Sequence, residues 1–343
     1  FYACILDEAQ AIKNHTTQKY KAVCKVRSRV RFALTGTPVE NRLGELWSIF
    51  SFLMPGYLPP YKSFCSRFEK PIVQEEDQTA VRRLNQLTGP FILRRMKSDV
   101  LKELPPKTEN VYRIELEEEQ RKLYLAAVVD AREKLQAAKP EDKMAVFAVL
   151  MRLREICCDP RLIADNWEGG SAKLDACVEL VSSAVEGGHR ILLFSQFTSM
   201  LELLAKRLDA EGISHFTLQG STPKPVRAEL VRRFNGGEVS VFLISLRAGG
   251  TGLNLTAADI VIHYDPWWNV AAQNQATDRA YRIGQQNPVQ VYKLIAQDTI
   301  EEKIVELQQA KQSLADTVTG TADGAILSMR PDELLQLLEG SEP

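Results

Sequence analysis

The stretch Ile191-Leu192-Leu193-Phe194-Ser195-Gln196-Phe197 decides the fold, together with the residues that follow it. Its first four residues form a short, continuous apolar run, which predicts a buried strand. Apolar residues then recur three and four positions apart, at Phe197, Met200, Leu201, Leu204 and Leu208. This spacing predicts a helix with one apolar side. A strand that leads directly into such a helix is the repeating unit of an α/β fold.

The same alternation continues to the end of the second half of the chain. Further strands are expected at 216–218, 239–245, 260–264 and 289–295, and helices at 223–234 and 270–282. Strands that alternate with helices predict a parallel sheet with helices on both faces. Because ligands of such sheets bind beyond the carboxyl ends of the strands, the loops at those ends are the candidate site.

The first half of the chain begins with the same alternation of strands and helices and then departs from it. We expect a buried strand at 1–6, a helix at 14–26 and a second strand at 30–34. Prolines and glycine interrupt residues 55–90, which predicts short inserted helices. A short strand at 91–93, a linker at Pro105-Pro106, two helices within 115–158 and a last helix at 331–338 complete the expected elements.

Composition narrows the class of protein. A formal net charge of −1 gives no bulk electrostatic sign of nucleic-acid binding, so any such binding needs a local basic surface. No apolar run approaches membrane-spanning length, and we expect no membrane partner. The six cysteines form no Cys-x-x-Cys pair, so no structural zinc site is expected, and Cys157-Cys158 is predicted to be buried packing. Scattered cysteines favour a reducing, intracellular compartment. We expect the cytoplasm, in association with the nucleoid, if the source is a bacterium, and the nucleus if it is a eukaryote.

Two polar segments follow the first two predicted strands. Asp7-Glu8-Ala9-Gln10 comes directly after the first, and adjacent carboxylates there suit magnesium-dependent phosphate chemistry. The alternative is a polar turn in which Asp7 caps a helix. Thr35-Gly36-Thr37-Pro38 follows the second strand, where small residues allow close approach to a ligand, although an ordinary turn also explains them.

Two more segments follow strands of the second half. Gly249-Gly250-Thr251-Gly252-Leu253-Asn254 could present several backbone N–H groups to phosphates, but the pattern is weak by itself. Asp265-Pro266-Trp267-Trp268-Asn269 carries paired tryptophans, which either pack in the core or expose an indole to nucleic acid.

Arg279 and Arg282 lie in the run from Gln275 to Gln285, which has helical composition. In a helix, residues three apart share a side, so the two guanidinium groups would face one set of anionic oxygens. The alternative is a solvated, charged helix side. The pair alone does not decide between them.

Taken together and in order, these segments resemble the motifs of the Swi/Snf-type ATPases of helicase superfamily two. Asp7-Glu8-Ala9-Gln10 resembles motif II, Leu34 to Pro38 motif III, and Leu193 to Phe197 motif IV. Residues 245–255 resemble motif V and residues 275–285 motif VI. The runs at 91–107 and 153–162 resemble the end of the family's first lobe and its second-lobe protrusion.

The resemblance implies the end of one RecA-like lobe and a complete second one, with parallel sheets covered by helices and with helical insertions. It divides the chain into the C-terminal part of lobe 1 at 1–108, with an insertion at about 55–90, and a helical protrusion at 109–170. Lobe 2 follows at 171–310, and a tail with a short helix at 311–343.

The resemblance also implies an activity: ATP hydrolysis coupled to movement along double-stranded DNA, without sequence preference, and displacement of proteins bound to it. Asp7 would hold Mg²⁺ through water, Glu8 would activate the attacking water, and Arg279 and Arg282 would be arginine fingers. The residues expected at the nucleotide are Gln275, Gly252, Thr35 and Thr37. The residues expected to contact DNA are Ser195, Gln196, Gly220, Ser221, Arg247, Thr251 and Trp268.

Two departures from the family's pattern stand out. Gln10 and Tyr281 occupy positions where many relatives have histidine, and neither carries metal or phosphate charge. No Gly-x-x-x-x-Gly-Lys-Ser/Thr phosphate loop occurs in the 343 residues, and Phe1 begins inside an apolar run. We therefore expect a piece of a longer protein that is inactive alone. A non-catalytic DNA- or protein-binding fragment and a strand-separating helicase remain alternatives.

Overall fold

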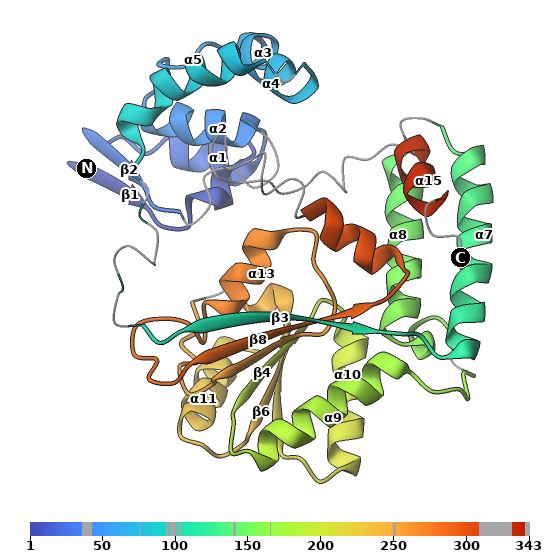
Figure 1. Cartoon of the computed structure of the whole chain (residues 1–343). Helices are drawn as coiled ribbons and strands as arrows, with labels where there is room; N and C mark the ends of the chain where they lie inside the picture. Colours follow the sequence, from blue (N-terminus) through green and yellow to red (C-terminus); the bar gives the residue numbers. More distant parts are fainter. Residues whose placement is uncertain are drawn as a thin grey trace. The chain divides into compact units, whose positions relative to one another are not determined.

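The structure, a computed structural model, describes residues 1–35, 43–75, 77–93, 95, 101, 104–139, 142–164, 166–249, 252–308 and 331–339. The chain forms two compact units, and each is described by itself (Figure 1). The described residues up to 95 belong to the first unit. Residues 101–307 and the helix at 331–339 belong to the second.

The first unit contains a sheet of two parallel strands among its described residues. β1 (Ala3–Leu6) pairs with β2 (Val30–Ala33), with Ala3 opposite Val30. The prediction of a buried strand at 1–6 is wrong in its burial, because Phe1, Tyr2 and Ile5 are 92%, 73% and 62% exposed. The described sheet is only two strands wide, so much of its apolar surface meets no neighbour.

Helices make up the rest of the first unit. α2 (Leu43–Leu53) contributes Leu46 and Phe50 to a core with Phe64 and Phe68 of the inserted segment. The other elements are η1 (Ala9–Ile12), α1 (Gln18–Cys24), α3 (Tyr61–Phe64), η2 (Cys65–Glu69), α4 (Lys70–Gln74), α5 (Gln78–Thr88) and η3 (Gly89–Phe91). The short strand expected at 91–93 is absent: Gly89-Pro90 begins a 3₁₀ turn, in which the N–H of Ile92 donates to the carbonyl of Gly89 at 3.2 Å.

The second unit is built on a six-stranded parallel sheet in the order β3-β8-β7-β4-β6-β5. Its strands are β3 (Lys107–Ile114), β4 (Ile191–Ser195), β5 (His215–Leu218), β6 (Val241–Ser245), β7 (Ile260–His263) and β8 (Val289–Ala296). β4, β6 and β7 are buried along their whole length, as their continuous apolar sequences predict.

Helices cover both faces of this sheet (Figure 1). Ile191 and Leu193 of β4 face α9 (Ala172–Glu186) and α10 (Thr198–Ala210). Leu192 and Phe194 face the other side, where α11 (Lys224–Asn235) and α13 (Val270–Thr277) lie. The predicted α/β class with a doubly covered parallel sheet is confirmed.

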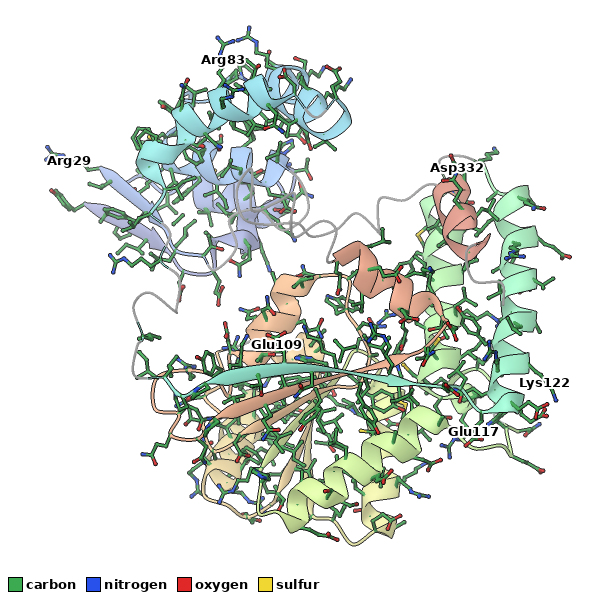
Figure 2. All side chains as sticks on the ribbon, viewed as in Figure 1. Arg29, Arg83, Glu109, Glu117, Lys122 and Asp332 are labelled. Atoms are coloured by element: carbon green, nitrogen blue, oxygen red, sulfur yellow. The ribbon has the colours of Figure 1, made fainter. Side chains whose placement is uncertain are left out.

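Strand β3 was not expected from the sequence, which we interpreted as helical after residue 109. It lies at the edge of the sheet and pairs with β8 along eight residues. Its residues are exposed up to Ile114, so they show no apolar alternation to identify a strand. Glu109, labelled on β3 in Figure 2, forms salt bridges with Lys107 at 2.6 Å and Lys293 of β8 at 2.8 Å.

Two long helices stand beside the sheet and carry the last helix of the chain (Figure 1). α7 (Glu118–Ala137) and α8 (Lys143–Cys158) pack as an antiparallel pair, and α15 (Pro331–Glu339) buries Leu334 and Leu338 against them. The sequence predicted all three. Among the described residues, no helix is both long and apolar enough to cross a bilayer.

Candidate functional site

Asp7 and Glu8 form the turn directly after β1, and both are exposed. Glu8 has φ 51° and ψ 52°, a left-handed conformation that is uncommon for a residue other than glycine. Its N–H donates to Oδ1 of Asp7 at 2.9 Å, and the N–H of Ala9 donates to the carbonyl of Leu34 at 2.9 Å. The turn is therefore fixed to the residue that follows β2. Strained positions of this kind cluster at functional sites.

A side-chain relay joins the ends of the two strands. Nε2 of Gln10 donates to Oε2 of Glu8 at 2.6 Å, and Oγ1 of Thr35 donates to Oε1 of Gln10 at 2.7 Å. An uncharged amide can donate and accept at the same time, so Gln10 serves both neighbours. The structure thus brings Asp7, Glu8 and Thr35 together. Thr37 lies outside the described residues.

The carboxylates of this turn fit magnesium held through water. Mg²⁺ prefers oxygen ligands, keeps several waters, and usually takes only one or two carboxylates beside the phosphates of a substrate. Within the described ranges, no group of three or more His, Cys, Asp or Glu side chains could enclose a metal. The turn would hold Mg²⁺ through Asp7, and the ion would supply charge neutralisation at the phosphates.

In the second unit, Asp265 joins the ends of two neighbouring strands. It follows β7, is 4% exposed, and its Oδ1 accepts hydrogen bonds from Oγ of Ser195 at 2.5 Å and from the N–H of Gln196 at 3.2 Å. Ser195 is the last residue of β4, which pairs with β7 in parallel. Burial raises the pKa of Asp265, while the charge of Arg154 and the hydroxyl of Ser195 oppose that rise.

Arg154 of α8 reaches the same point from the helical pair. Its Nη2 lies 3.3 Å from Oδ2 of Asp265 and donates to the carbonyl of Pro266 at 2.5 Å. The guanidinium carbon lies 4.5 Å from the centre of the Trp268 ring. The side chains of Arg154 and Asp265 are both wholly buried.

Two residues predicted to contact DNA have buried side chains in this structure. Ser195 is 1% exposed and its hydroxyl is bonded to Asp265, and Trp268 is 4% exposed. Phe147 packs against Trp268 with ring centres 6.1 Å apart. Of the two alternatives for the tryptophan pair, core packing describes Trp268. The exposure of these two side chains gives no support to a direct DNA contact through either of them.

The other predicted DNA contacts are placed differently. Gly220 and Ser221 are exposed in the loop that precedes α11. The amide nitrogen and oxygen of Gln196 are buried without a hydrogen-bond partner. Arg247 lies in the short helix α12 (Leu246–Gly249), and its side chain, like the whole of Thr251, falls outside what the structure describes.

The prediction that Arg279 and Arg282 share one side of a continuous helix is wrong. α13 ends at Thr277, and residues 278–284 form turns and bends. The carbonyl of Arg279 accepts from the N–H of Leu255 at 3.0 Å, and that of Ala280 accepts from Nε2 of Gln285 at 3.1 Å. These carbonyls bond to groups outside the helix, which turns the backbone away from the helical path.

The turn that carries the arginines is fastened to the loop of residues 252–258. Nη1 of Arg282 donates to the carbonyl of Leu253 at 3.2 Å. Nε2 of Gln285, a residue only 6% exposed, donates to the carbonyl of Ala258 at 2.7 Å. Gly252 is exposed, with φ +40°. Arg279 is 7% exposed, and Gln275 is half-buried on α13.

Three positioning residues were missed by the sequence analysis. Asp265, Arg154 and Gln285 were quoted within motifs but were given no role of their own. Arg154 had a detectable signal, since it lies four residues after Leu150 and next to Leu153, on the side of the helix that supplies core residues. No local pattern distinguishes a buried Gln or Asp from an exposed one.

Two family profiles and a solved structure match this chain. The profile of the SNF2-related domain matches residues 2–162, and that of the helicase conserved C-terminal domain matches residues 172–284. The SWI2/SNF2 ATPase core of Sulfolobus solfataricus in complex with double-stranded DNA is 35% identical in sequence, with a TM-score of 0.58. That match covers 97% of this chain and 71% of the other. The chain belongs to the SWI2/SNF2 family of ATPases.

Relatives of known sequence are longer. An uncharacterized ATP-dependent helicase of Mycoplasma genitalium is 39% identical over 344 residues, which cover 99% of this chain and 33% of the relative. A Bacillus subtilis protein with the provisional name ATP-dependent helicase/translocase is 41% identical over 341 residues. These cover 97% of this chain and 37% of the relative. The chain spans about a third of the length of these curated relatives.

Proposed function

We propose that this chain is the C-terminal part of an ATP-dependent double-stranded-DNA translocase of the SWI/SNF type. The full protein would couple ATP hydrolysis to movement along DNA and so displace bound proteins. Asp7 would hold Mg²⁺ through water and Glu8 would activate the hydrolytic water. Arg279 and Arg282 would stabilise charge that develops on the transferred phosphate. The family membership and the names of the relatives support this proposal.

The observation that carries the catalytic part is the strained Asp7-Glu8 turn with its relay to Thr35. A carboxylate held in a fixed orientation at a strand end is what general-base activation of water requires. The relay links Glu8 to the segment that we propose responds to the nucleotide. Thr35, together with Thr37, would pass that response to the rest of the enzyme. Gln275 and Gly252 would contact the nucleotide from the second unit.

The DNA-binding part is proposed for the loop ends of the second unit. Gly220 and Ser221 are exposed before α11, and backbone N–H groups at such a place suit phosphate oxygens. Arg247 and Thr251 remain proposed contacts, and Gln196 would join them once its buried amide turns outward. Ser195 and Trp268 would act by holding these loops. Contacts of this type position the protein without selecting a sequence.

Equilibrium binding of labelled duplexes to the purified chain tests the DNA part. We expect binding that is equal for unrelated sequences of the same length and that weakens steeply as salt rises, because phosphate contacts release counterions. Binding to one sequence alone, or binding that salt leaves unchanged, would exclude the proposed mode. The same chain with Ser221→Asp should bind more weakly, and Ser183→Asp on α9 serves as its control.

A further inference from the structure

Arg154 is the largest wholly buried side chain of the protein's described part, and the proposed function gives it no role. It stands on α8 next to the core residue Leu153, and its guanidinium lies against aromatic rings. Its Nη2 is bonded to Asp265 and Pro266, but its Nε and Nη1 have no hydrogen-bond partner. A buried guanidinium with two unsatisfied nitrogens costs free energy that an apolar residue of similar volume would not. Stability alone therefore does not explain an arginine here.

The contacts of Arg154 connect three separate segments. It comes from the α7–α8 pair, and through Asp265 it reaches Ser195 and the N–H of Gln196 at the end of β4. Through the carbonyl of Pro266 and the ring of Trp268 it also holds the loop that follows β7. Phe197 lies on the same guanidinium, with 5.5 Å from the guanidinium carbon to the ring centre. Lysine could not reproduce this set, because only a planar guanidinium bonds at its edge while aromatic rings contact its face.

Gln196 is held in place by these contacts. Its backbone N–H is fixed by Asp265, while both polar atoms of its side chain are buried and unpaired. Unpaired buried amides are uncommon in native proteins and need a reason. An amide that turns outward and pairs only when a ligand arrives would be such a reason, and the loop of Gln196 is one of the proposed DNA contacts.

We propose that Arg154 is the positioning residue of the DNA-binding loops in the second unit. It fixes the loops at 195–197 and 265–268 in one arrangement, so that the Gln196 segment is held ready to meet a DNA phosphate. It also makes that arrangement depend on the position of the α7–α8 pair. This inference rests on the proposed function, because it concerns the same DNA-binding loops.

The test measures the affinity of the 343-residue chain for a labelled duplex, with folding of each variant checked by circular dichroism and thermal melting. Arg154→Met should weaken binding about tenfold, within the range known for coupled neighbours. Arg154→Lys should restore part of the loss, because it keeps the charge beside Asp265. The control is Arg113→Met with Glu302→Gln, which removes an ion pair whose two residues lie outside the loops at 195–197 and 265–268. The control should bind as the unaltered chain does.

A double-variant cycle distinguishes a purely structural role of Arg154 from the positioning of the Gln196 loop. In a Gln196→Ala background, Arg154→Met should change affinity less than about twofold, because Arg154 acts through that loop. Each of three results would overturn the inference. The first is a folded Arg154→Met variant with unchanged affinity for the duplex, and the second is an equal loss of affinity in the control. The third is a change in affinity that is simply additive with that of Gln196→Ala. If Arg154→Met does not fold, Asp265→Asn decides in its place: weaker binding supports the inference and unchanged binding overturns it. No binding by the unaltered chain would overturn the proposed function itself.

Discussion

Thr35 and Gln10 are joined by a hydrogen bond of 2.7 Å, from the threonine hydroxyl to the amide oxygen, and Gln10 in turn bonds Glu8 at 2.6 Å. The two strands that these residues follow are neighbours, so their ends meet at one edge of the sheet. The relay means that the orientation of the Glu8 carboxylate depends on the conformation of the segment after β2. In the proposed motor, that dependence would link the bound phosphate to the parts that move.

Gln10→Ala removes the middle of this relay. In this chain joined to the phosphate-loop-bearing part of a relative, we expect ATP turnover to fall between about tenfold and a hundredfold, because a misplaced base loses its alignment. KM for ATP should change little, since Gln10 carries no charge. Steady-state phosphate release measures both. Exposed Gln18→Ala on α1 is the matched control, and equal turnover in the two variants would contradict the role given to Gln10.

His263 predicts a pH dependence of stability. It is 2% exposed, its Nε2 lies 2.9 Å from Oγ1 of Thr277, and burial with the charge of Lys293 lowers its pKa to about 3. In the unfolded chain, the same imidazole takes up a proton near pH 6.5. The folded protein therefore has its full stability above pH 6.5 and loses free energy of unfolding as the pH falls toward 3. At pH 4.5 the loss should be about 2 to 3 kcal/mol in the free energy of unfolding.

Urea unfolding at several pH values measures this loss. In His263→Gln, whose amide can still pair with Thr277 but does not titrate, the fall in stability between pH 6.5 and 4.5 should be smaller by about 2 kcal/mol. The same fall in both proteins would show that His263 does not carry the effect.

The buried pair of Lys173 and Glu301 predicts a non-additive response. Both side chains are wholly buried, and Oε2 of Glu301 also accepts from the N–H of Ala296 at 2.9 Å. Lys173→Met alone leaves an uncompensated buried carboxylate and should cost about 3 to 5 kcal/mol. Adding Glu301→Gln removes that charge and keeps an acceptor for Ala296, so the double variant should be more stable than Lys173→Met. A double variant less stable than either single one would contradict this account.

Gln285→Ala tests the fastening of the arginine turn. The change leaves the buried carbonyls of Ala258 and Ala280 without their side-chain donor and should cost about 1 to 3 kcal/mol. Thermal melting measures the cost. Exposed Gln286→Ala, next in sequence, is the control for local substitution. Equal melting temperatures in the two variants would show that the Gln285 contacts contribute nothing.

The second-unit sheet was predictable because its central strands, such as Ile191–Ser195, are continuous apolar runs followed by apolar helical stripes. β3 was not, because seven of its eight residues are exposed and it is held by backbone pairing with β8. The length of α13 was overestimated because the competing hydrogen-bond donors come from Leu255 and Gln285, which no helical pattern reveals.

The candidate site was predictable where polar residues come directly after a predicted strand, as at Asp7 and Glu8. It was less so where burial decides, as at Trp268, whose sequence allowed both an exposed and a buried ring. The partners of Arg154 lie 111 and 112 residues away, and long-range pairing of this kind leaves no local signal.

The most direct measurement of the central claim is DNA-stimulated phosphate release. The purified chain should hydrolyse ATP negligibly with or without duplex DNA, because its sequence contains no Gly-x-x-x-x-Gly-Lys-Ser/Thr phosphate-loop pattern. Joined to the phosphate-loop-bearing part of a relative, it should hydrolyse ATP in response to DNA. Glu8→Gln or Arg279→Ala should then reduce that rate by about a thousandfold. DNA-stimulated hydrolysis by the chain alone, or full activity in both variants, would contradict the account.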